Sequence, residues 1–128
     1  MPQGFPASTG DVLSAAMYNG LVTFGLNDQS GSTYTVANSD LYQVLVRTTN
    51  ASTKTVTIAP DSTLTAAAVG STITFLNSGA GDLTFAAGSG VTIVSAGATS
   101  AAPKLGQYKS CVAIRIAANS WTIVGAVA

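Results

Sequence analysis

Apolar and polar residues alternate with a period of two along most of the chain. From Thr33 onward apolar side chains recur at every second position, and threonine fills many of the positions between them. This alternation is typical of β-strands that bury one face and expose the other. It predicts about eight strands, whose buried faces carry the apolar residues at 34–36, 42–46, 56–58, 73–75, 83–85, 91–93, 112–116 and 121–123.

Short turn-forming sequences separate these apolar runs. Asn, Asp, Ser, Gly and Pro residues gather at 38–40, 60–62, 77–81, 88–90 and 118–120. Such residues favour turns because they tolerate unusual backbone angles or hydrogen-bond their own backbone. Many short strands at this spacing predict an all-β fold, an antiparallel β-sandwich or a jelly-roll or barrel.

Three similar tetrapeptides raise an alternative architecture. Val-Thr-Ile-Ala at 56–59, Leu-Thr-Phe-Ala at 83–86 and Val-Thr-Ile-Val at 91–94 resemble successive rungs of a β-solenoid. Solenoids repeat at a fixed period, whereas the intervals between these peptides are irregular. We therefore favour the sandwich or barrel and keep the solenoid as the alternative.

The first 31 residues follow a different pattern. Thr9-Gly10-Asp11 offers a helix start, and residues 27–32 have the composition of a linker. We predict an arm with a short helix over residues 1–31 and a β-domain over residues 32–128. The helix could pack on its own domain or serve as a docking arm, since both use one apolar stripe. The stripe consists of Val12, Leu13, Ala16, Met17 and Leu21.

Charge is scarce in this chain. Only 8% of the 128 residues are charged, the net charge is zero, and there is no His or Glu. The bases form no run that could neutralise phosphates, so we expect no nucleic-acid partner. No apolar run approaches the ~20 residues of a membrane span, and the start lacks the features of a secretion signal. Low charge favours association, so we expect copies or partners to cover much of the surface.

Residues for catalysis or metal binding are equally scarce. The five Asp residues share no motif, and one Cys without His cannot build a zinc site. We predict no catalytic, cofactor or metal site, and we expect Cys111 to be core filler. Three tyrosines could serve as exposed aromatic contacts, for example to a glycan: Tyr34, Tyr42 and Tyr108.

Several segments resemble phage structural proteins. The run from Gly70 to Ile93 resembles a segment of phage appendage and head-associated proteins, followed by Asn119-Ser120-Trp121 near the end of the chain. Residues 10–16 are similar to a stretch near the start of some fibre and virion proteins. The resemblance implies a virion structural protein, made in the host cytoplasm and assembled on the particle. It also implies a homotrimer.

We weigh three roles, two of which the resemblance implies. We expect a capsid decoration, or cement, protein that binds the major capsid protein shell, because the chain is short and has an arm. The alternative is a tail-fibre or head-fibre component, or a glycan-binding knob. A free-standing carbohydrate-binding or hydrolytic module is the third, and the missing His and Glu argue against hydrolysis.

Overall fold

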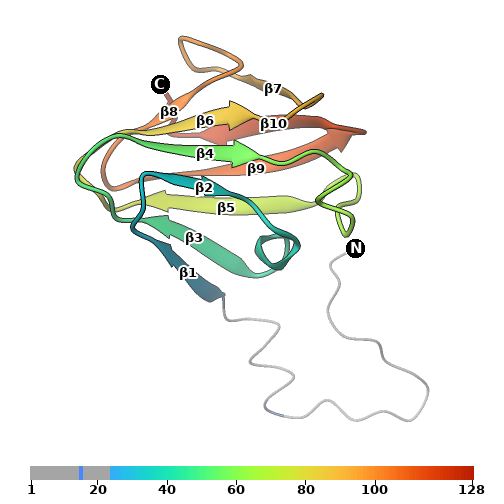
Figure 1. Ribbon diagram of the computed structural model, residues 1–128, viewed down its shortest axis with the longest axis horizontal. Helices are drawn as coiled ribbons and strands as arrows, with labels where there is room; N and C mark the ends of the chain where they lie inside the picture. Colours follow the sequence, from blue (N-terminus) through green and yellow to red (C-terminus); the bar gives the residue numbers. More distant parts are fainter. Residues whose placement is uncertain (1–14, 16–23) are drawn as a thin grey trace.

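The computed structural model describes residue 15 and residues 24–128, which form two β-sheets and one short 3-10 helix (Figure 1). The predicted helical arm lies outside these residues, as do all five residues of its apolar stripe. The elements are β1 (Gly25–Gln29), β2 (Thr33–Thr35), η1 (Asn38–Asp40), β3 (Val44–Thr48), β4 (Lys54–Ile58), β5 (Thr72–Asn77), β6 (Leu83–Ala87), β7 (Thr92–Ser95), β8 (Lys104–Leu105), β9 (Lys109–Ala117) and β10 (Ser120–Gly125).

The all-β class is confirmed, and each predicted strand overlaps an observed one. Two strands were not predicted. β1 overlaps the stretch 27–32 expected to be a linker, and that expectation is wrong for residues 27–29, because β1 pairs with β3 along its whole length. β8 is only two residues long, too short for alternation to show.

The strands form two mixed sheets. The six-stranded sheet has the order β1-β3-β5-β9-β10-β7, and the four-stranded sheet has the order β2-β4-β6-β8. The expectation of antiparallel sheets is wrong for most pairings. β1–β3, β3–β5, β2–β4, β4–β6 and β7–β10 are parallel, whereas β5–β9, β9–β10 and β6–β8 are antiparallel.

From β1 to β6 the chain alternates between the two sheets, so that each of β3, β4, β5 and β6 pairs in parallel with the second strand before it. Leu45 pairs with Thr74, 29 residues later, and Lys54 pairs with Leu83 at the same separation. One pass of the chain through both sheets is here called a coil. The first coil is shorter, because paired residues are 19 positions apart between β1 and β3 and 22 apart between β2 and β4. This winding is that of a β-solenoid with coils of unequal length. Sequence analysis kept the solenoid only as the alternative, because the intervals between the similar peptides are irregular.

The turns that join the two sheets are stacked without space between their backbones. A Cβ atom added to Gly79 would lie 2.1 Å from the carbonyl oxygen of Asn50, and one added to Gly81 would lie 2.0 Å from that of Ser52. Neither glycine has a positive φ. Close approach of the backbones, rather than an unusual conformation, therefore requires glycine at these two positions.

Asn77 ties this stack together at the end of β5. Its buried side-chain amide donates to the carbonyl oxygens of Gly81 and Leu105, at 2.9 Å each. Its Oδ1 accepts from the Thr48 hydroxyl at 3.1 Å and from the Gly79 N–H at 3.0 Å. The amide uses both donors and both lone pairs, so this buried polar group leaves nothing unsatisfied.

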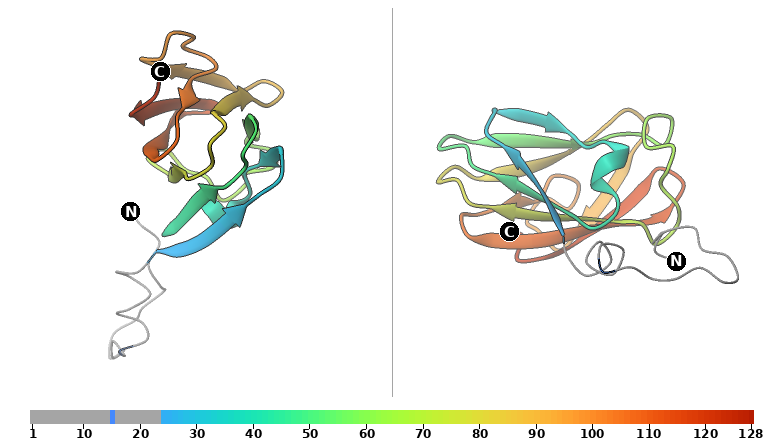
Figure 2. Two further views of the ribbon diagram at one scale, coloured as in Figure 1. Left: turned by 90° about the vertical axis from the view of Figure 1, so that its left-hand side faces the viewer. Right: turned by 90° about the horizontal axis from the view of Figure 1, so that it is seen from below.

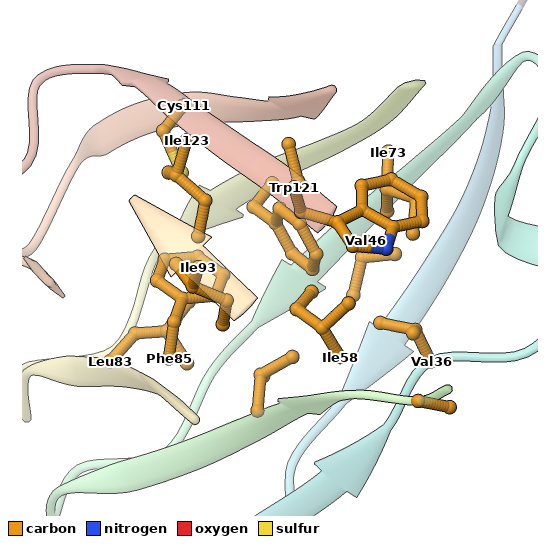
Figure 3. Packing of buried hydrophobic residues seen from close by; sticks show 14 of the residues in the cluster. Val36, Val46, Ile58, Ile73, Leu83, Phe85, Ile93, Cys111, Trp121 and Ile123 are labelled. Atoms are coloured by element: carbon orange, nitrogen blue, oxygen red, sulfur yellow. The ribbon is translucent and has the colours of Figure 1, made fainter. Parts of the chain in front are cut away.

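The buried faces of both sheets contribute to one hydrophobic core (Figure 3). Phe75 of β5 and Phe85 of β6 join the sheets through an edge-to-face ring contact with centroids 4.9 Å apart. Trp121 is 1% exposed, and its indole N–H has no partner among the described residues. Cys111 is 3% exposed within this core.

The hairpin of β9 and β10 ends the winding, because it inserts antiparallel strands between β5 and β7. Its turn is tied to the loop after β4. The carboxylate of Asp61 accepts two hydrogen bonds from the Arg115 guanidinium, at 2.6 and 3.2 Å, and one from the Asn119 N–H. Figure 2 shows β1 and β2 at one end of the molecule, with β7 and β8 toward the other.

We expect Gly81→Ala to lower the free energy of unfolding by about 1–3 kcal/mol or more, because the new methyl overlaps the backbone of the neighbouring turn. Urea denaturation measures this change. Gly31→Ala is the matched control, since its Cβ would lie 3.7 Å from the nearest heavy atom, an ordinary contact. Equal stability of the two variants would contradict the stacked-turn arrangement.

Candidate functional site

A polar groove opens where β1, β2 and η1 meet. Its volume is about 460 Å³. It lies at the free end of the coil stack, since β1 and β2 are edge strands of their sheets. Its polar lining consists of Asn27, Gln29, Tyr34, Ser39 and Asp40.

Asp40 is the centre of the hydrogen bonds in this groove, and it is 1% exposed. Its carboxylate accepts from the Asn27 amide at 2.8 Å, the Tyr34 hydroxyl at 2.5 Å and the Ala37 N–H at 3.0 Å. Burial, and then the hydrogen bond to Asp40, raise the pKa of Tyr34 to about 12. Both carboxylate oxygens accept hydrogen bonds from within the chain, so this network holds η1 and β2 against β1.

Other reactive groups lie apart from the groove. Lys54 is 2% exposed, its ammonium donates to the carbonyl oxygen of Gly31, and burial lowers its pKa. Burial also raises the pKa of Cys111 to about 12, which disfavours the reactive thiolate. Within residues 15 and 24–128, no group of three or more His, Cys, Asp or Glu residues could hold a metal ion.

The three tyrosines proposed as aromatic contacts do not share an environment. Tyr34 is partly buried, and its hydroxyl is bonded to Asp40. Tyr42 is partly buried as well, and its hydroxyl donates to the carbonyl oxygen of Ala66 at 3.0 Å. Tyr108 alone is well exposed, at 77%, and has a φ of 61°. The structure brings no aromatic platform together from these three residues.

The side of the six-stranded sheet away from the core, here called the outer face, is strongly aliphatic. The sheet register aligns its side chains across neighbouring strands, since Leu26 pairs with Leu45, and Val112 pairs with Val124. These side chains are partly or well exposed. The outer face carries Leu26, Leu45, Leu76, Val94, Val112, Ile114 and Val124, with Thr72, Thr74 and Thr122 between them.

Sequence analysis missed this surface because it assigned the wrong phase to β9. The apolar residues of 112–116 were expected to face the core, yet Cys111 and Ala113 are the buried ones. Ile116 is 53% exposed. Both phases of this strand are apolar, so alternation alone could not tell the two faces apart. The signal available was size, because the small residues Cys111 and Ala113 fit between packed sheets.

The opposite side of the molecule has a different character. The outward positions of β2, β4 and β6 form what we call the threonine face. Thr33 pairs with Thr55, which in turn pairs with Thr84. The two outward sheet surfaces of one chain thus differ, one hydroxyl-rich and one aliphatic. The threonine face consists of Thr33, Thr35, Thr55, Thr57 and Thr84.

No protein-family model matches the chain, and no match was found among curated proteins or solved structures. Among the described residues there is no helix of the length and apolarity needed to cross a membrane.

We expect the free energy of unfolding to fall more steeply between pH 10 and pH 12 in the wild type than in Tyr34→Phe. The pKa of Tyr34 is raised from 10.0 to about 12 by folding. Its contribution to stability is therefore complete below pH 10 and is lost as the pH rises to about 12. Urea denaturation across this range measures the difference.

Tyr108→Phe is the control for this experiment, since it removes an exposed tyrosine and keeps the Tyr34–Asp40 hydrogen bond. It should show the steep fall of the wild type. The assignment fails if Tyr34→Phe shows the same fall.

Proposed function

We propose that this chain is a non-enzymatic structural protein of a phage particle, a decoration protein that binds and stabilises the major capsid protein shell. The outer face is the observation that carries this proposal. A broad aliphatic surface with little charge is typical of protein contacts, because apolar patches of this kind are seldom left open to water. We propose that the protein acts in the virion as a homotrimer.

The use of polar groups inside the fold supports a structural role. Asp40, Lys54 and Arg115 each hold two segments of the chain together. Catalysis by acid–base groups would instead need such side chains gathered in an accessible cleft. The groove at β1, β2 and η1 contains a carboxylate whose oxygens are already bonded within the chain.

A fibre or glycan-binding knob is the second candidate, and Tyr108 is the observation that favours it. Tyr108 is 77% exposed and lies on the loop before β9. Exposed aromatic rings are common contacts for sugars and proteins alike. This role would require few copies at the tail, whereas decoration requires many copies on the head.

We expect the purified full-length protein to co-sediment with phage heads that lack it, in many copies per head. Quantitative gel analysis of the pelleted heads gives the copy number. Absence of binding to heads, with binding to tails or to host-surface glycan, would contradict decoration and favour the second candidate.

The proposed arm is tested in the same assay. Leu13→Lys/Met17→Lys places two charges on the predicted apolar stripe, so we expect it to lose binding to heads. Ser14→Lys, which lies off the stripe, is the matched control and should bind as the wild type does. If the double variant binds normally, the arm is not the docking element.

A further inference from the structure

We propose that the outer face of the six-stranded sheet is where copies of this chain meet, each copy turning the same face toward a common symmetry axis. This rests on the proposed function in one respect, that the outer face is a protein contact. What it adds is the identity of the partner, a second copy of the chain.

The centre of the outer face is built for a dry contact. Val112 and Ile114 stand on β9, which lies between β5 and β10. Val124 is the direct cross-strand partner of Val112. The adjacent outward positions on β5 carry threonine, whose methyl groups also suit a packed interface. Burial of such side chains contributes roughly 25 cal/mol per Å² of apolar surface removed from water.

The only charges at the outward positions of the described strands of this sheet neutralise each other. Arg47 and Asp28 pair in register on β3 and β1, with nitrogen–oxygen distances of 2.5 and 2.8 Å. Both side chains stay partly exposed. A second copy would bring the same neutral ion pair. The guanidinium of one copy could then lie near the carboxylate of the other. Neither long-range repulsion nor an unpaired buried charge opposes contact between copies.

The size of the face suits an interface of this kind. Six strands about 4.8 Å apart, with five or six residues of about 3.3 Å each, cover roughly 500 Å² in projection. The accessible surface of the side chains exceeds that projection. A standard interface buries roughly 800 Å² per partner, so the face and its border supply most of what is needed. Phe24, which is 55% exposed beside β1, extends that border.

The threonine face shows that the aliphatic character is specific to one side. Strand formation alone does not require it, because Thr is as good a strand former as Val or Ile on an exposed face. Thr55 and Thr84 are outward residues of the two inner strands of the four-stranded sheet, and Ile114 and Val112 are outward residues of an inner strand of the six-stranded sheet. The aliphatic side chains are therefore concentrated on the outer face, and the outer face of a second copy, which is equally aliphatic and neutral, would cover them.

Sedimentation velocity of the full-length protein at micromolar concentration tests the proposal without any capsid. We expect a trimer for the wild type. Ile114→Lys should weaken association by roughly 100-fold or more, because it buries an unpaired charge at the contact. Thr84→Lys adds the same charge on the threonine face and should sediment as the wild type does.

A second variant distinguishes a lost contact from a misfolded protein. Val112→Thr/Ile114→Thr keeps β-branched side chains on both positions, so strand propensity is preserved while the apolar contact is removed. We expect a folded protein by circular dichroism whose association is weakened. A monomeric wild type, with the outer face covered by residues 1–23 or left for a capsid protein, would overturn the proposal. So would a Val112→Thr/Ile114→Thr variant that assembles normally.

The two proposals fail separately. A protein that forms trimers through this face but does not bind heads contradicts decoration alone. A monomer that binds heads contradicts the homotrimer and the contact between copies, and leaves decoration standing.

Discussion

The backbone contact between stacked turns sets the register of both sheets. The turn over residues 78–82 lies on the turn over residues 49–53, and the backbone of the earlier turn leaves no room for a side chain at Gly79 or Gly81. Asn77 closes the same corner with four hydrogen bonds. Because the turns coincide, β5 must lie on β3 and β6 on β4 with the same separation of 29 residues. A one-residue slip in either pair would reverse its buried and exposed side chains.

That register brings the buried sides of the two sheets onto one core and leaves two outward surfaces of unlike chemistry. The core is closed by the β9–β10 hairpin, whose antiparallel strands end the coiled winding. Asp61, bonded to Arg115 and Asn119, fixes that hairpin to the loop after β4. The aliphatic outer face is thus presented by strands drawn from both ends of the described chain.

The few charged groups of the described chain are mostly committed to the fold. Asp40 and Tyr34 hold the first coil together, and Lys54 is bonded to the carbonyl of Gly31. In a chain with only 8% charged residues, this leaves an unusually neutral surface. Such a surface suits a protein that remains in contact with other proteins, as our proposals for decoration and for contact between copies both require.

The sequence by itself determined where most strands lie, because a period of two in side-chain polarity is a local property of each strand. It did not determine pairing, since parallel stacking depends on contacts between residues about 20 to 30 positions apart. β1 was missed because its polar residues resemble a turn, yet Asn27 finds partners in Tyr34 and Asp40. The phase of β9 was also decided only in three dimensions. Both of its faces are apolar, and the space between the sheets admits Cys111 and Ala113, which leaves the larger side chains outside.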